Sequence, residues 1–454
     1  MPTQNLRTDA EEETTRLLSQ LIRIDTTNPP GNETQAAGLL AEELGREGIG
    51  YDIYESTPQR GSIIARLKGT GEKPRVLLLS HLDVVPAQAA EWAVNPFSGA
   101  VKDGFVWGRG ALDMKGMTAI EVMTLKLLKR EGVKLKGDVI LAATADEEMG
   151  GLGGADYLLR AHPEKIFAEY VLNEGGGSAI PLSGRNLFTV SSAEKGLLWF
   201  RVRARGVSGH GSMPETADNA VLRMNRVVER LGNYRRKPVL VPAMRQFLNE
   251  VAAAEAGVRE PVARMLADPE ASDKVLEELE GSAVVVADEV RPRIRMSITP
   301  TMIRGGVKEN VIPSECEAVF DCRVLPGQTT SEAMALVREL LRDVGLERLS
   351  FETIQVQEAS ESSVDTPLFR AIEDSLRLFE PNCGVAPILM AGGTDSRFFR
   401  RMGSVCYGFH PMRSETQLGA KLTRREHGVD ERISVENLVF GVSVLYEAVK
   451  RLVT

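Results

Sequence analysis

The stretch 75–86, RVLLLSHLDVVP, contains a short apolar run at residues 76–79 and, after it, two side chains with acid–base chemistry. They are His81 and Asp83, two residues apart. Because strand side chains repeat with a period of two, both are expected to point the same way. An imidazole beside a carboxylate suits a metal ion, but a neighbouring Asp also commonly holds a structural His. The remaining chain must distinguish these two interpretations.

Further candidate ligands recur along the chain, where a predicted strand ends or a glycine-rich turn begins. They are Asp113, Glu147, Glu148, Glu174 and His427. A mixed set of imidazoles and carboxylates suits zinc, and one carboxylate shared by two ions would give a two-metal cluster. The side chains of the adjacent pair Glu147 and Glu148 diverge, so one can bind metal while the other carries a proton.

Apolar strands are predicted at residues 76–79, 138–144 and 170–172, each followed closely by candidate ligands. A helix with one apolar face is predicted between the first two, at residues 115–129. This alternation predicts an α/β fold with a mixed, mostly parallel sheet and helices on both faces. Open α/β sheets place their sites at the carboxyl edge, which is where these candidates stand.

The composition is that of an ordinary globular protein, with 43% hydrophobic and 26% charged residues. A chain of 454 residues exceeds the roughly 250–300 at which one core stops growing, so two domains are expected. The net charge of −8 argues against nucleic acid or an anionic membrane as a partner.

Three features of the sequence bear on the cellular compartment of the protein. Residues 1–16 lack the apolar core of a signal peptide, and no apolar run approaches the roughly 20 residues of a membrane span. The cysteines form no CxxC pair, and free thiols fit a reducing compartment. We therefore expect a cytoplasmic protein.

The pattern changes near Gly196, and we expect one domain interrupted by another. The predicted boundaries give a first part at 1–195, an inserted domain at 196–357 and a closing part at 358–454. Within the insertion, strands are predicted at 198–202, 293–298, 318–324 and 350–356, and helices at 219–231 and 331–344. This split β-α-β order resembles a small ferredoxin-like α+β sandwich. It is interrupted by a helix-rich tract at 234–292, of a length typical of functional insertions.

Taken together, the motifs resemble those of the M20 family of zinc peptidases and deacylases. The motifs, in family order, are HLDVVP, GRGALDMKG, DEEMGG, NEGGG, SGHGSMP, GGVKENVIP to DCRVLPG, GGTDSR and HGVDE. The resemblance covers nearly the whole chain and is nearest to the branch of carboxypeptidase S and the N-acyl-amino-acid hydrolases, through GGTDSRFF and HGVDERIS. It implies a zinc-peptidase-like catalytic domain interrupted by a lid and dimerisation domain.

The resemblance also implies roles for the candidate residues. Asp113 would bridge two zinc ions, with His81 and Glu174 on one ion and Glu148 and His427 on the other. Cobalt or manganese often occupies such ligands as well. Asp83 would orient the ring of His81, and Glu147 would be the general base and acid.

Six further residues are implied in substrate binding or catalysis. His210 in SGHGSMP would polarise the substrate carbonyl or steady the oxyanion, commonly from a partner subunit, which implies a homodimer and domain closure; the alternative is a structural turn histidine. Asn310 and Arg323 would hold the substrate carboxylate, although a turn cap and an internal ion pair are the structural alternatives. Gly392 and Gly393, together with Thr394, would shape the floor of the substrate site, although Gly-Gly-Thr is equally an ordinary tight turn.

We therefore expect a two-metal hydrolase that cleaves an amide or peptide bond next to a free carboxylate. Its substrate would be a small N-acyl amino acid or a short peptide. The alternatives are a dipeptidase, an acetylornithine- or succinyl-diaminopimelate-type deacylase, or a non-catalytic binder of amino-acid conjugates. A binder would not need Glu147 as a base.

Overall fold

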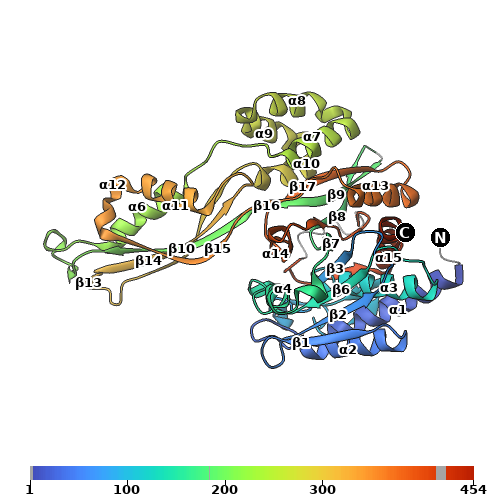
Figure 1. Ribbon diagram of the computed structural model, residues 1–454. Coiled ribbons are helices and arrows are strands. Elements are labelled where there is room, and N and C mark those ends of the chain that lie inside the picture. The colour runs from blue at the N-terminus through green and yellow to red at the C-terminus, as the bar shows by residue number, and fades with distance from the viewer. Residues whose placement is uncertain (1–3, 184, 416–425) are drawn as a thin grey trace. The chain divides into compact units, whose positions relative to one another are not determined.

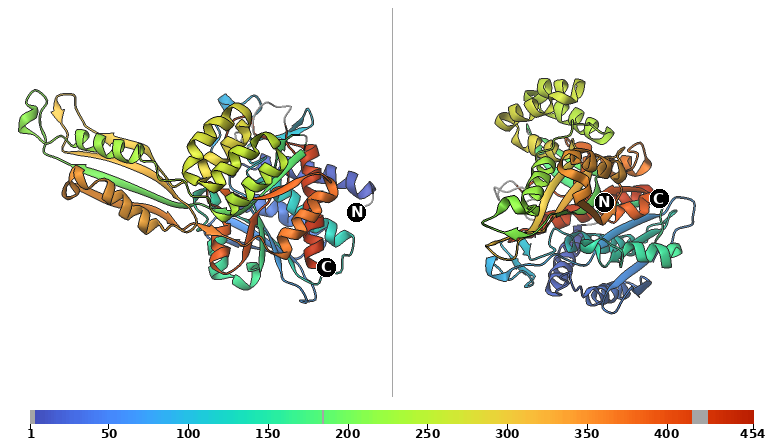
Figure 2. Two further views of the ribbon diagram at one scale, coloured as in Figure 1. Left: turned by 90° about the horizontal axis from the view of Figure 1, so that it is seen from above. Right: turned by 90° about the vertical axis from the view of Figure 1, so that its left-hand side faces the viewer.

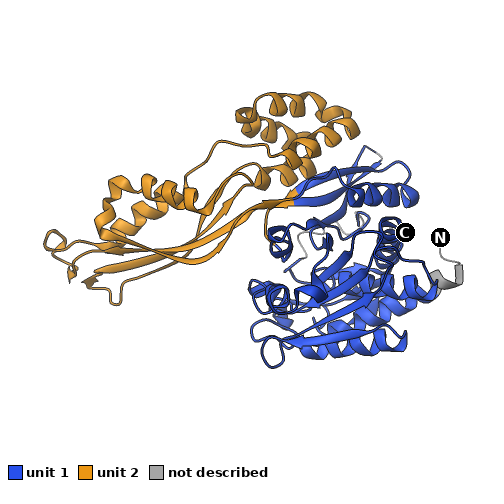
Figure 3. Cartoon of the chain, in the orientation of Figure 1, with its two compact units in different colours: residues 1–192, 362–388, 394–454 blue, residues 193–361, 389–393 orange. Residues whose placement is uncertain are grey.

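The computed structural model describes residues 4–183, 185–415 and 426–454. The chain divides into two compact units (Figure 3). Unit 1 comprises residues 1–192, 362–388 and 394–454, and unit 2 comprises residues 193–361 and 389–393. The divisions at 192/193 and 361/362 stand beside the expected boundaries at 195/196 and 357/358, and the short stretch 389–393 groups with unit 2.

Unit 1 is built on a mixed sheet. In spatial order its strands are β1 (Tyr51–Glu55), β2 (Gly61–Leu67), β6 (Val139–Thr144), β3 (Val76–His81), β7 (Tyr170–Asn173), β18 (Val405–Gly408) and β9 (Arg185–Glu194). Strands β8 (Gly176–Leu182) and β17 (Gly384–Met390) also pair with β9. The central strands β6, β3, β7 and β18 are parallel, whereas β1, β2 and β9 are joined antiparallel. The expected mixed α/β sheet with a parallel centre is confirmed.

Helices cover both faces of this sheet, which explains why β3 is apolar throughout. Val76 and Leu78 pack into one core, and Leu77 and Leu79 pack into the other. The first core is closed by α1 (Gln4–Arg23), α2 (Glu33–Arg46), α3 (Lys115–Arg130), α13 (Pro367–Phe379) and α15 (Val435–Val453). The second is closed by α4 (Ala155–Ala161), α5 (Pro163–Ile166) and α14 (Ser396–Arg401).

Unit 2 contains an antiparallel sheet in the order β12 (Ser297–Gly305), β14 (Glu315–Val324), β10 (Gly196–Arg205) and β15 (Leu349–Gln357). Helices α6 (Ala220–Gly232) and α11 (Thr330–Leu340) pack on one face through a shared apolar core. The β-α-β-β-α-β connectivity and this strand order are those of a ferredoxin-like sandwich. Short elements complete the unit: β11 (Gly209–His210), β13 (Val311–Ile312), α12 (Arg342–Gly345) and β16 (Ser360–Glu361).

The helix-rich tract of unit 2 forms a cluster of its own. It comprises α7 (Pro242–Ala254), α8 (Arg259–Ala267), α9 (Ser272–Ser282) and α10 (Val284–Val290). These helices pack successively against one another, as the yellow and yellow-green ribbons of Figure 2 show. Across the described parts of the chain, we find no helix with both the length and the apolar character that a bilayer span requires.

Candidate metal centre

Three candidate ligands stand at the carboxyl edge of the parallel strands. In the ladder, His81 at the end of β3 lies opposite Thr144 at the end of β6, and Leu78 lies opposite Leu172 of β7. Figure 1 shows β6, β3 and β7 side by side. The chain therefore leaves all three strands at one edge, where Glu148 follows β6 and Glu174 follows β7.

A small second sheet in unit 1 brings in the other two ligands. Its strands are β4 (Ala100–Lys102), β5 (Phe105–Trp107) and β19 (Arg432–Ser434), with Arg432 opposite Trp107. Because β5 precedes the loop of Asp113 and β19 follows the loop of His427, their pairing joins two loops that are distant in sequence. The buried Glu431 carboxylate fixes the first loop, accepting the backbone N–H groups of Leu112 at 2.7 Å and Asp113 at 3.1 Å.

The five side chains form two sets that share Asp113. In one set, His81 Nε2 lies 3.0 Å from Asp113 Oδ1 and 3.8 Å from Glu174 Oε2. In the other, His427 Nε2 lies 3.1 Å from Asp113 Oδ2 and 3.3 Å from Glu148 Oε1. The ligand atoms of each set lie within 4.8 Å of one another. The two oxygens of Asp113 thus face different sets.

Burial and mutual charge shift the proton affinities of these groups. Hydrogen bonds with Asp113 and Glu148 raise the pKa of His427 to about 10. Burial works against protonation of His81, but the charge of Glu174 and the hydrogen bond with Asp113 raise its pKa well above the ordinary value. Burial raises the pKa of Glu174 to about 7. The cluster therefore holds an excess of carboxylates that attracts positive charge.

The donor set fits two divalent cations. Zinc binds His nitrogen and carboxylate oxygen at about 2.0–2.2 Å, which places two tetrahedral ligands roughly 3.3–3.6 Å apart. The separations above, 3.0–3.8 Å, bracket that range. Glu174 Oε1 is buried without a hydrogen-bond partner among the described residues, so it retains a free lone pair for a cation. The residues that would hold the ions are His81, Asp113, Glu148, Glu174 and His427.

Asp83 contacts His81 mainly through its backbone. His81 Nδ1 donates to the Asp83 carbonyl oxygen at 2.9 Å, while the Asp83 carboxylate is 3.5 Å away. Since a carbonyl can only accept, Nδ1 carries the proton and Nε2 is left as the ligand nitrogen. The Asp83 carboxylate instead accepts the backbone N–H groups of Glu147 and Glu148, both at 3.1 Å. Asp83 thereby fixes both the ring and the adjacent turn.

Glu147 lies in neither ligand set. It begins a 3₁₀ turn, η2 (Glu147–Met149), that also carries Glu148. Burial and the charge of Glu174 raise the pKa of Glu147 well above its ordinary value. A carboxyl group with raised proton affinity beside a cation site is suited to accept and return a proton.

The other predicted residues lie in unit 2 or at its boundary. His210 is exposed on β11 opposite Val311 of β13, and Gly211 donates its N–H to the Asn310 carbonyl at 2.8 Å, so His210 and Asn310 are neighbours. Arg323 forms an ion pair with Asp321, with Nε 2.8 Å from Oδ1. The structural alternative for Arg323, an internal ion pair, is thus present.

Gly392 and Gly393 belong to unit 2, and Thr394 belongs to unit 1. A Cβ at Gly393 would lie 2.0 Å from Gln357 Nε2, so a larger residue there would require the Gln357 side chain to move. The buried Thr394 hydroxyl accepts from Asn173 Nδ2 at 3.3 Å, directly beside Glu174. Thr394 therefore supports the loop that carries a candidate metal ligand.

Comparison with known proteins identifies the family. Residues 77–451 match the peptidase family M20/M25/M40. The chain belongs to this family. The resemblance inferred from the motifs is thereby confirmed, and the chain is a hydrolytic enzyme of the M20 type.

Relatives of this M20 chain cover most of its length. It is 28% identical to the human N-fatty-acyl-amino acid synthase/hydrolase PM20D1 over 387 residues, which are 82% of this chain and 73% of that protein. It is 26% identical to pig aminoacylase-1 over 444 residues, 96% of this chain and 94% of that protein. An M20 metallo-carboxypeptidase from Sulfolobus solfataricus shares the fold, with a TM-score of 0.73 and 18% identity over 97% of this chain and 99% of that one.

Several residues that support the M20 site were not predicted. Asn28 Nδ2 donates to Asp83 Oδ2 at 2.8 Å, and Arg109 Nη1 lies 2.6 Å from Glu431 Oε2. Two sequence signals could have indicated them: Asn28 opens the Asn-Pro-Pro-Gly break, and Glu431 closes the HGVDE motif. Their partners, however, are 55 and 322 residues away, so the contacts depend on the fold.

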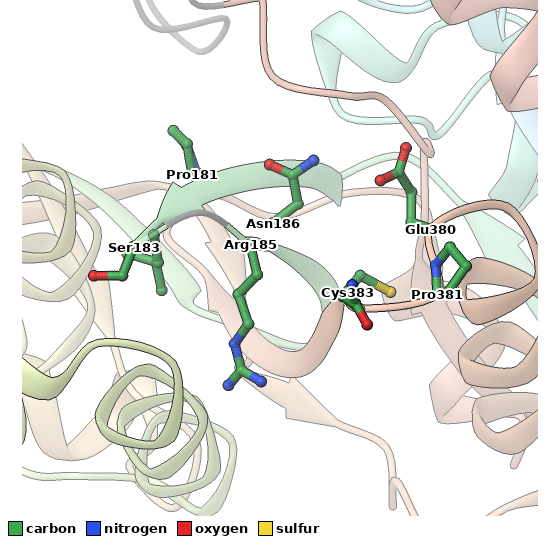
Figure 4. Close-up of a pocket in the computed structure, with 9 residues that line it drawn as sticks. Pro181, Ser183, Arg185, Asn186, Glu380, Pro381 and Cys383 are labelled. Carbon is green, nitrogen blue, oxygen red and sulfur yellow. The ribbon is translucent and has the colours of Figure 1, made fainter.

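A pocket of about 420 Å³ elsewhere in unit 1 is lined by Arg185, Asn186, Glu380 and Cys383 among others (Figure 4). None of its lining residues belongs to either metal-ligand set. It is therefore separate from the candidate metal centre.

Proposed function

We propose that this M20 enzyme is a two-zinc hydrolase that cleaves an amide or peptide bond next to a free carboxylate. It would act as an N-acyl-amino-acid deacylase or as a metallocarboxypeptidase. The observation that carries the proposal is the pair of ligand sets sharing Asp113, with Glu147 in the same turn as Glu148. The names of the relatives above, which include hydrolases of acyl amino acids and a metallo-carboxypeptidase, support it.

In the proposed reaction, Glu147 moves one proton. Two bound cations would supply Lewis acidity, which polarises a carbonyl and can lower the pKa of water from about 15.7 to about 7. Glu147 takes a proton from the attacking water while the water oxygen adds to the scissile carbonyl carbon. Glu147 then returns that proton to the amide nitrogen as the C–N bond breaks, so a carboxylic acid and an amine leave.

The substrate carboxylate would be held by unit 2. A guanidinium binds a carboxylate through two parallel N–H groups, and Arg323 offers one. Asn310 would add an amide donor, and Gly392, Gly393 and Thr394 would form the floor. We also propose a homodimer through unit 2, supported by the exposed apolar side chains of Leu222, Ile303 and Val307, which are 64%, 60% and 94% exposed.

Purified full-length enzyme loaded with Zn²⁺ is expected to release methionine from N-acetyl-methionine or the C-terminal residue from a Gly-capped dipeptide. Removal of the metal with a chelator should abolish the reaction, and the carboxamide of N-acetyl-methionine should be a poor substrate. Cleavage of dipeptides alone would indicate a dipeptidase. Selective cleavage of N-acetylornithine or succinyl-diaminopimelate would indicate the corresponding deacylase. No turnover on a broad acyl panel, despite two bound metals, would indicate a binder.

His210→Ala is expected to lower kcat by about 10²–10³ with unchanged metal content, because an oxyanion donor acts chiefly in the transition state. Ring Nδ1 of His210 lies 2.8 Å from Ser212 Oγ, which leaves Nε2 for the substrate. The matched control is Glu215→Gln, on the same exposed loop, with wild-type kcat expected. The measurements are steady-state kinetics, metal analysis and sedimentation of the dimer. An unchanged kcat would remove His210 from the mechanism.

A further inference from the structure

The turn that carries Glu147 and Glu148 begins at a residue with unusual backbone geometry. Asp146 has φ +73°, in the left-handed region that a non-glycine residue seldom adopts. Its side chain closes the loop by accepting the Gly153 N–H at 2.8 Å on Oδ2. Its main-chain carbonyl accepts the Gly151 N–H at 2.7 Å. The conformation of Asp146 therefore sets the direction of the two glutamates that follow it.

A single arginine ties Asp146 to a helix. Arg60 Nη2 donates to Asp146 Oδ1 at 2.9 Å. The same guanidinium donates two hydrogen bonds of 2.8 Å to the Glu33 carboxylate. Glu33 is fully buried and is the first residue of α2. Gly31 leaves room for this guanidinium, since a Cβ there would lie 2.4 Å from Arg60 Nε. Arg60 thus anchors the Asp146 side chain to α2. Two other contacts support the turn: Asn28 Nδ2 donates to Asp146 Oδ1 at 3.4 Å, and the Asp83 carboxylate accepts the N–H groups of Glu147 and Glu148.

The opposite end of this turn has a separate anchor. Arg397 Nη2 donates to the Gly150 carbonyl at 2.6 Å, and its Nη1 donates to the Thr394 carbonyl at 2.7 Å. When Arg60 is removed, this end and the Asp83 contacts to the N–H groups of Glu147 and Glu148 remain, so the freedom gained is confined to the Asp146 side of the turn. The loss of Arg60 would then redirect Glu147 and Glu148 without unfolding the loop.

We propose that Arg60 is a positioning residue of the centre, which acts through Asp146 to aim Glu147 and Glu148. Its effect on turnover rests on the proposed function, whereas its effect on the Glu148 ligand set does not. The same two strands supply a matched control. Arg66 on β2 pairs with Asp138 just before β6, with Nε 2.7 Å from Oδ2. Since β2 and β6 are antiparallel, the Arg60–Asp146 and Arg66–Asp138 ion pairs lie at opposite ends of the β2–β6 ladder.

The test compares Arg60→Met with Arg66→Met in the full-length chain. Calorimetric titration of the metal-free protein with Co²⁺ is expected to give an unchanged first step in both variants. In Arg60→Met the second step should weaken about tenfold, and kcat at saturating metal should fall about 10- to 100-fold with KM within twofold. Arg66→Met should match the wild type in its Co²⁺ affinities and in its kcat. If the two variants have the same metal affinities and the same kcat, the proposal is wrong.

Two further outcomes are also decisive. If wild-type enzyme turns over no acyl amino acid or peptide, the proposed function fails, and the Co²⁺ titration alone decides whether Arg60 positions the Glu148 set. If Arg60→Met does not fold, Asp146→Asn replaces it, because Asn tolerates the left-handed backbone but removes the charge-assisted bond. A weakened second step in that variant supports the proposal, and wild-type affinities overturn it.

Discussion

Replacing Glu147 with Gln is expected to lower kcat by about 10²–10⁴ while both metal ions stay bound. A carboxamide has the same shape as the carboxylate but cannot take a proton from water. Glu147 belongs to neither ligand set, and the contact that fixes it is its backbone N–H to Asp83, which Gln retains. The loss should therefore fall on proton transfer alone, with KM nearly unchanged.

The measurement is kcat and KM on N-acetyl-methionine, with metal content determined on the same preparation. Glu148→Gln is the matched control, because it alters the neighbouring residue of the same turn but removes a candidate ligand. That variant should lose one ion as well as activity. Near-normal turnover of Glu147→Gln would exclude Glu147 as the base, and loss of an ion would place it among the ligands.

The positions of the candidate ligands at the strand ends could be predicted because strand geometry decides them. Residues 76–79 are apolar since both faces of β3 are covered, and parallel neighbours must leave the sheet at one edge. His81 and Glu174 stand at the ends of such strands. Their position at this edge therefore does not depend on the conformation of the loops. The parallel centre of the sheet followed from the same alternation of strands and helices.

The supporting contacts could not be predicted, because they join residues with no common pattern. Arg60 and Asp146 are 86 residues apart, and nothing in either segment indicates the other. Asp83 illustrates the same limit. The sequence does not indicate which acceptor of Asp83 faces the His81 ring; the carbonyl is nearer, at 2.9 Å, because of the path of the chain after β3.

One strand of unit 2 is displaced from its predicted position. The apolar pattern predicted a strand at 293–298, whereas residues 291–293 form a 3₁₀ turn after α10 and β12 runs from Ser297 to Gly305. Ile294 and Met296 are buried, so the alternation reflects packing rather than strand pairing. β12 is exposed along most of its length, so an apolar pattern does not reveal it.

The arrangement of the candidate metal centre predicts different effects for different candidate ligands. Asp113→Ala is expected to reduce metal content from two ions to fewer than one per chain and kcat/KM by at least about 10³, because it removes a ligand from both sets. The fold should survive, since the loop is held by the backbone N–H of residue 113 on Glu431, which alanine keeps. Asp156→Ala, on α4 outside both sets, is the matched carboxylate control with wild-type metal content expected.

His427→Ala should behave differently, because His427 belongs to only one set. The ion held by His81, Asp113 and Glu174 should remain, giving one ion per chain and a Co²⁺ titration with a single step. Metal analysis and calorimetry of both variants therefore test whether Asp113 is shared. If Asp113→Ala kept one tightly bound ion, as His427→Ala is expected to, the two sets would be independent and Asp113 would not bridge them.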